Sequence, residues 1–225
     1  LHPVAHSFPT RRSSDLYLSE ALPLARRLGS SAQLAGVLNN LGMLHYERGE
    51  YRRALALHQE GLTVARRADD ARHTACLAEG MATIHRDAGA YRRAERLYDM
   101  AWRIARKRRP EQAVDILAAR ADLYRWQGDP ARALELLEDA EQLTEGQGMD
   151  PSSGCTLSMG RGIALVESGD IAEGIAQLNE VLQLLSKRQR RRDLARGQFL
   201  LAKAHLLAGE KREAAARLEE ALGLA

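Results

Sequence analysis

Histidine is the residue of this chain with the widest chemical use, because an imidazole can bind a metal or transfer a proton near neutral pH. The chain has seven histidines, and three of them, His45, His85 and His205, each precede a glycine by four residues. They recur at multiples of 40 residues, and Tyr124 stands at the equivalent position, four residues before Gly128. Neighbouring helices lie about 10 Å apart, whereas zinc needs its ligands at about 2 Å. We therefore expect packing histidines and no metal site.

The other residues suited to catalysis form no recognisable arrangement. Cys76 and Cys155 are 79 residues apart, and two cysteines are too few for a disulfide framework or a four-ligand zinc site. The chain has no HExxH motif and no Ser/His/Asp order. The glycines at 146, 148, 160 and 162 follow no expected strand, so they do not form a phosphate-binding loop. We expect no catalysis, no cofactor and a reducing, cytoplasmic location.

The composition excludes several classes of protein. Of the 225 residues, 45% are hydrophobic and 28% charged, which excludes a disordered chain and a membrane bundle. No run of about 18 apolar residues is present to span a bilayer. Aromatic residues are only 4%, which is low for an all-β protein, and the net charge of +3 is too small to indicate a nucleic-acid-binding protein.

A basic cluster at residues 187–192 (KRQRRR) has two readings. Its charge would attract an acidic peptide, a nucleic acid or a phosphorylated partner. We favour an exposed turn that ends a helix, because the position of the cluster follows the phase of the 40-residue repeat described below. In addition, no aromatic residues alternate with the basic ones as stacking on single strands requires.

Five glycines recur at nearly constant spacing. Gly49, Gly89, Gly128, Gly169 and Gly209 are separated by 40, 39, 41 and 40 residues. On both sides of each glycine, apolar residues recur at i, i+3, i+4 and i+7, which predicts two amphipathic helices. Five residues after each glycine stands a small residue that lets two helices approach closely, namely Ala54, Ala94, Ala133, Gly174 and Ala214. The repeated unit is therefore a helical hairpin.

The turn of each hairpin has its own signature. The glycine supplies the left-handed conformation that ends the first helix. The acid that follows it, as in Glu50, Asp129 and Asp170, is expected to cap the second helix. Basic residues gather at the other end of the second helix, where they complement the helix dipole. The third hairpin instead ends in residues 145–148 (EGQG), so we expect a looser connection there.

Residues 39–55 (NNLGMLHYERGEYRRAL) resemble the tetratricopeptide repeat, in the 40-residue variety of kinesin light chain and MalT-like bacterial transcription regulators. The resemblance extends over residues 17–225 and is weakest in the fourth repeat. It implies an all-α solenoid, a right-handed superhelix of antiparallel hairpins. The expected elements are a lone helix at 17–29 and hairpins at about 33–68, 71–107, 111–146, 153–187 and 192–225.

The first sixteen residues do not share this pattern. Residues 6–16 (HSFPTRRSSDL) resemble the translation of a common short-read sequencing adapter. We expect residues 1–16 to be an artefactual tail, with a genuine disordered tail as the alternative. The array begins with half a hairpin and ends without a polar capping helix, so we expect it to be truncated at both ends.

The family resemblance also implies a binding surface. In these arrays the first helices of successive hairpins line a concave face that contacts a peptide. The positions that match are Asn40, Met43, Glu47, Glu79, Thr83, Arg86, Asp115, Asp122, Arg125, Trp126, Met159, Ile163, Arg196, Phe199 and Lys203. Asn40 stands where many such arrays place an asparagine that binds the peptide backbone. The later repeats lack that asparagine, which argues against the clamp used on chaperone tails.

These observations predict a non-catalytic scaffold for protein–protein interaction, within a larger bacterial regulatory protein. Its partner would be a protein, a peptide or another domain of the same parent chain, with no membrane and no nucleic acid bound by this part. The alternative is the effector-sensing region of a MalT-like ATP-dependent transcription regulator, in which Trp102 or Trp126 would stack on a small molecule.

Overall fold

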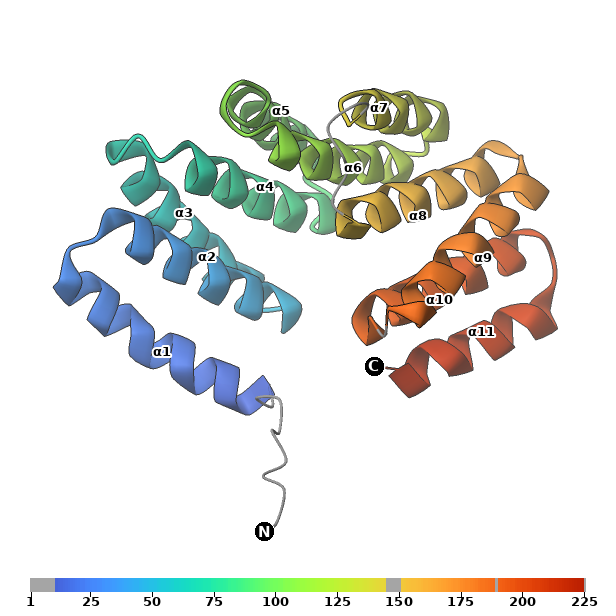
Figure 1. The fold of residues 1–225 in the computed structure, drawn as a ribbon, viewed down its shortest axis with the longest axis horizontal. Coiled ribbons are helices and arrows are strands. Elements are labelled where there is room, and N and C mark those ends of the chain that lie inside the picture. Colours follow the sequence, from blue (N-terminus) through green and yellow to red (C-terminus); the bar gives the residue numbers. More distant parts are fainter. Residues whose placement is uncertain (1–10, 145–150, 189, 225) are drawn as a thin grey trace, which may run out of the picture. The chain divides into compact units, whose positions relative to one another are not determined.

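The computed structural model describes residues 11–144, 151–188 and 190–224. All secondary structure in this part of the chain is α-helical, which confirms the all-α fold class (Figure 1). The helices are α1 (Arg11–Leu28), α2 (Ser31–Glu47), α3 (Tyr51–Arg67), α4 (Ala71–Asp87), α5 (Tyr91–Arg108), α6 (Pro110–Trp126), α7 (Pro130–Gln142), α8 (Pro151–Ser168), α9 (Ile171–Lys187), α10 (Arg191–Leu207) and α11 (Lys211–Leu224). None of the described helices is long and apolar enough to cross a bilayer.

The first helix begins earlier than its periodicity indicates. Helix α1 starts at Arg11, inside the adapter-like segment, rather than at residue 17. Once a helix is nucleated, each further residue adds one backbone hydrogen bond, so helices extend readily into flanking residues. The helix ends at Leu28, directly before Gly29, which has a φ of 70°.

The helices pair in chain order as hairpins, and the chain divides into two compact units. Unit 1 is Leu1–Arg109 and contains the hairpins α2–α3 and α4–α5, with α1 packed against α2. Unit 2 is Pro110–Ala225 and contains α6–α7, α8–α9 and α10–α11. Within each unit the first helices lie beside one another, since α2 contacts α4, and α8 contacts both α6 and α10. Each unit therefore presents a layer of first helices backed by second helices.

The turns confirm the role expected of the glycines. The five turn glycines all have positive φ, from 73° at Gly89 to 110° at Gly169. At the first turn, the Glu50 amide donates to the His45 carbonyl at 2.9 Å and the Gly49 amide donates to the Tyr46 carbonyl at 2.9 Å. These bonds satisfy carbonyls that the end of the first helix would otherwise leave unpaired.

The expected capping of the second helices is right at one position and wrong at two. Asp129 accepts a hydrogen bond from the Arg132 amide at 3.0 Å and so caps α7. Glu50 and Asp170 stand before α3 and α9 without a side-chain capping bond. The Glu50 side chain is one methylene longer than an aspartate and instead reaches back across the turn to His45. The connection at 145–148 lies outside the described residues.

Small residues allow the helices of each hairpin to approach closely. The positions five residues after the turn glycines are buried in all five hairpins. At Gly174 the approach leaves no room for a side chain, since a Cβ atom would lie 2.4 Å from the Gly162 carbonyl oxygen of the paired helix. Around this contact, Leu178, Leu182 and Leu201 belong to the core of unit 2. Full burial of one such leucine side chain stabilises a fold by about 2 kcal/mol.

Candidate protein-interaction surfaces

The fifteen residues that the family resemblance selected all lie on first helices. In unit 1 they are Asn40, Met43 and Glu47 on α2, with Glu79, Thr83 and Arg86 on α4. In unit 2 they are Asp115, Asp122, Arg125 and Trp126 on α6, Met159 and Ile163 on α8, and Arg196, Phe199 and Lys203 on α10. The two sets belong to different units.

A bidentate ion pair joins α6 to α8 in unit 2. The Arg125 guanidinium donates to the Glu167 carboxylate through Nε at 2.8 Å and through Nη2 at 2.9 Å. Its remaining terminal nitrogen, Nη1, donates to Asp122 at 2.5 Å, one turn earlier on α6. Arginine suits this position because its planar fork matches the two oxygens of a carboxylate.

Two residues of α10 complete the group. Lys203 donates from Nζ to Glu167 at 2.7 Å, and Arg196 donates to Asp122 at 3.3 Å. Asp122, Arg125, Glu167, Arg196 and Lys203 thus form one network over three successive first helices, which we term the charge cluster. Its three cations and two carboxylates leave one positive charge in excess.

Burial divides the charge cluster into a fixed centre and an accessible edge. The Arg125 side chain is 6% exposed and that of Glu167 is 15% exposed, whereas those of Arg196 and Lys203 are 50% and 44% exposed. Burial alone would raise the pKa of Glu167, but the hydrogen bonds from Arg125 and Lys203 outweigh it and lower that pKa. Glu167 therefore stays ionised at neutral pH and holds Lys203 near solvent, while Arg196 donates to Asp122.

Glu167 is the member of the charge cluster that the family resemblance did not select. It stands two residues before the turn glycine Gly169, and Glu47, which was selected, stands two residues before Gly49. Glu167 therefore occupies the same repeat position as the selected Glu47, and this equivalence is the sequence signal that points to Glu167.

Unit 1 has a smaller contact at the same repeat positions. The Tyr46 hydroxyl, three residues before its turn glycine, donates to Asp87 at 2.6 Å. Asp87 stands two residues before the next turn glycine, so Tyr46 and Asp87 correspond to Arg125 and Glu167. Arg86 also donates to Asp87, from Nε at 2.9 Å. Burial, together with the Asp87 carboxylate, raises the pKa of Tyr46, so this hydroxyl stays protonated and remains a donor.

Three other selected residues of unit 1 form a separate exposed strip. Asn40, Met43 and Glu47 are exposed along α2, at spacings of three and four residues that place them on one side of the helix. On α4, the Thr83 hydroxyl lies 3.0 Å from that of the fully buried Tyr98. Thr83 therefore holds the tip of a core side chain.

The structure places two selected residues in the core instead of on the surface. Met159 and Ile163 are fully buried and pack in the core of unit 2. The reason is the central position of α8, which contacts α6, α7, α9 and α10. We therefore leave both residues out of the binding surface.

Aromatic side chains extend the accessible edge of the charge cluster. On α10, Phe199 is 54% exposed and lies three residues after Arg196 and four before Lys203, so the three share one side of the helix. On α6, Asp115, Asp122 and Trp126 follow one another at spacings of seven and four, and Trp126 is 57% exposed. Unit 2 therefore offers two stripes that combine charged and aromatic side chains.

Two of the three repeated histidines pair with an acid within their own hairpins. His45 pairs with Glu50 at 2.9 Å and His205 pairs with Glu210 at 2.6 Å, in each case across the turn. His85 has Ala90 at the corresponding position and makes no such pair. The described residues contain no group of three or more potential ligands placed to hold a metal ion.

Comparison with known proteins places this geometry among helical repeats. Residues 33–107 match the family model of the tetratricopeptide repeat. No curated protein matches the chain in sequence. BtubC from P. vanneervenii is similar in structure, with a TM-score of 0.67 and 18% identity over 96% of this chain and 91% of that one.

Two further structures superpose more closely. A Rap protein complexed with competence and sporulation factor has a TM-score of 0.80 and 18% identity, and the match covers 96% of this chain and 59% of that one. The apo form of RapI has a TM-score of 0.78 and 15% identity over 95% of this chain and 76% of that one. At these identities the similarity is one of fold.

Proposed function

The chain carries tetratricopeptide repeats over residues 33–107, and from this premise we propose that it is a non-catalytic scaffold that binds a partner protein or peptide on its first helices. We place it in a larger bacterial regulatory protein. The fold it shares with a Rap protein complexed with competence and sporulation factor supports this setting.

The charge cluster is the observation that carries the proposal. Its buried centre fixes Glu167 and Asp122, which in turn hold Lys203 and Arg196 at the surface of α10. Cations that are already ordered lose less conformational freedom when they bind a ligand than mobile ones do. Ordering of Arg196 and Lys203 by the charge cluster therefore lowers the entropy cost of binding a ligand.

The stripe on α10 indicates the chemistry of the partner. Arg196 and Lys203 favour acidic side chains, and Phe199 between them favours an apolar one. A peptide with acidic residues on either side of an apolar residue matches this order. Trp126 on α6 provides a second apolar contact within the same unit.

The test is selection of peptides from a random library on the full chain, followed by affinity measurements with variants. Arg196→Gln/Lys203→Gln is expected to weaken binding about tenfold or more. Lys211→Gln/Arg212→Gln removes the same charge from exposed positions on the second helix α11 and serves as the control. Equal affinities of the two double variants would refute the proposed surface. Stabilisation by a small metabolite but by no peptide would instead favour the effector-sensing alternative.

A further inference from the structure

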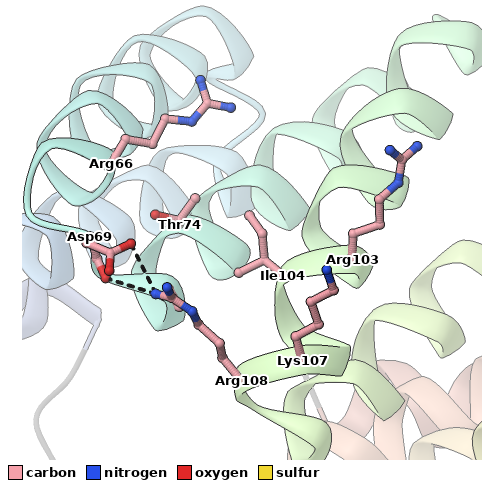
Figure 2. Close-up of a pocket in the computed structure, with 8 residues that line it drawn as sticks. Arg66, Asp69, Thr74, Arg103, Ile104, Lys107 and Arg108 are labelled. Carbon is pink, nitrogen blue, oxygen red and sulfur yellow. Dashed lines mark hydrogen bonds and ion pairs between the residues drawn. The ribbon is translucent and has the colours of Figure 1, made fainter.

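A cleft in unit 1 contains none of the fifteen residues that the family resemblance selected. It has a volume of about 440 Å³ and is lined by residues of α3, α4 and α5 and of the α3–α4 turn. Its lining residues are Arg66, Asp69, Ala71, Thr74, Arg103, Ile104, Lys107 and Arg108. Figure 2 shows Arg66 on one side of the cleft and Arg103 and Lys107 on the other, with Thr74 and Ile104 between them.

The lining of this cleft is strongly basic. It contains four cationic side chains and a single carboxylate, that of Asp69. Helix α5, which contributes three of the four, has seven basic and two acidic residues, an excess of five, although the whole chain carries only +3. Positive charge is therefore concentrated on this helix.

Internal partners leave part of this charge unbalanced. Arg108 pairs with Asp69 at 3.1 Å, and Arg103 pairs with Asp99 on its own helix. Arg66 donates to the sulfur of Met100 at 2.7 Å, which supplies no negative charge. Among the described residues, neither Arg66 nor Lys107 has a carboxylate partner.

The equivalent cleft of unit 2 shows that the basic lining is not a consequence of the repeat geometry. That cleft, of about 290 Å³, is formed by α7, α8 and α9. Thr74, Ile104 and Arg108 have Gly154, Leu184 and Arg188 as their counterparts, counted from the turn glycines Gly89 and Gly169. Its lining contains one cation, Arg188, and one carboxylate, Glu141. Charge complementary to the helix dipole would act equally in both units, so it does not account for the difference.

We propose that the cleft of Arg66, Arg103, Lys107 and Arg108 binds the phosphoryl group of a phosphorylated ligand. Guanidinium groups donate paired hydrogen bonds to phosphate oxygens, and the lysine adds a point charge. The volume of the cleft lies within the range of small-ligand sites, about 300–1,000 Å³, and exceeds what a phosphate alone needs. Ile104 offers an apolar contact to the organic part of the ligand. The phosphoryl group can belong to a free metabolite or to a phosphorylated side chain of a protein.

The first experiment uses the full chain and inorganic phosphate at constant ionic strength. Backbone amide resonances of Ala71, Thr74 and Ile104 are expected to shift with saturation as phosphate replaces chloride. Arg66→Gln/Lys107→Gln is expected to weaken this binding about tenfold. The matched control is Lys187→Gln/Arg188→Gln, which removes the same charge at the end of the corresponding helix in unit 2.

Two results would overturn the proposal. One is the absence of saturable shifts at these three amides. The other is equal weakening by both double variants, which would indicate bulk charge instead of a site. If phosphate binds, comparison of O-phosphoserine with a pentapeptide containing phosphoserine identifies the source. Tighter binding of the pentapeptide indicates a protein ligand, and equal or weaker binding indicates a metabolite.

Discussion

The Arg125 guanidinium forms two hydrogen bonds, of 2.8 and 2.9 Å, with the Glu167 carboxylate of the next hairpin. Tyr46 and Asp87 make the corresponding contact in unit 1, with a hydroxyl in place of the guanidinium. In both units a donor three residues before one turn glycine meets an acid two residues before the next. The contact therefore fixes the register between consecutive first helices.

We predict that Glu167→Gln destabilises unit 2 by about 2 kcal/mol. The substitution leaves the Arg125 guanidinium buried opposite a neutral amide, and breaking one side of a buried pair is costly. Chemical denaturation at pH 7 measures the change in the free energy of unfolding. Glu173→Gln, at an exposed position in the first turn of α9, is the control and is expected to change stability by less than about 0.5 kcal/mol. Equal losses in the two variants would contradict the role of the pair.

The burial of the His58 imidazole leads us to predict that the folded protein loses stability in acid. The imidazole is fully buried and has no hydrogen-bond partner among the described residues, and its Cε1 atom would lie 2.6 Å from a Cβ on Gly42 and 2.8 Å from one on Gly80. Burial lowers the pKa of His58 from 6.5 to about 4. Because the folded-state pKa lies below the unfolded one, this contribution to stability is complete above pH 6.5 and is lost as the pH falls towards 4.

The variant His58→Leu tests this dependence, since leucine occupies the corresponding positions 137 and 178 of unit 2. Between pH 7.5 and 4.5, the free energy of unfolding of the original chain is expected to fall by about 2 kcal/mol more than that of the variant. Denaturant titrations at the two pH values give the comparison. An identical fall in both proteins would show that His58 does not titrate with unfolding.

The close approach of Gly162 and Gly174 predicts a strong effect of one methyl group. A Cβ on Gly174 would lie 2.4 Å from the Gly162 carbonyl oxygen and 2.6 Å from Val166, and backbone atoms cannot give way cheaply. Gly174→Ala is therefore expected to destabilise the chain by about 1–3 kcal/mol, measured by thermal or chemical unfolding. The control is Gly223→Ala on α11, where a Cβ has nothing within 4 Å. Helix propensity should make that variant neutral or slightly more stable, and a greater loss there than at Gly174 would contradict the packing argument.

The hairpins were predictable from the sequence because their signals are local. A glycine at positive φ ends the first helix of a hairpin, and the small residue five positions later lets the second helix pack closely against it. Both signals lie within a few residues of the hairpin turn, so their recurrence in the sequence predicts the repeated hairpin. The family resemblance, in turn, selected Asp122, Arg125, Arg196 and Lys203, which the structure brings into one network.

The remaining features depend on how consecutive hairpins are stacked. Glu167 meets Arg125 across 42 residues, and only the alignment of α6 with α8 makes the pair. Met159 and Ile163 are apolar residues on a first helix, and their burial follows from the contacts of α8 with helices of the preceding and the following hairpin. For Glu50, one additional methylene directs the carboxylate to His45 instead of the end of α3.

The most direct test of the scaffold is to locate a bound peptide on the full chain. A library-selected peptide with a photo-crosslinking group at its apolar residue is irradiated with the protein, and the attachment sites are mapped by mass spectrometry. The account predicts crosslinks on α10 and α6, around Phe199 and Trp126, that Arg196→Gln/Lys203→Gln reduces and Lys211→Gln/Arg212→Gln leaves unchanged. Crosslinks confined to the second helices α7, α9 and α11 would contradict it.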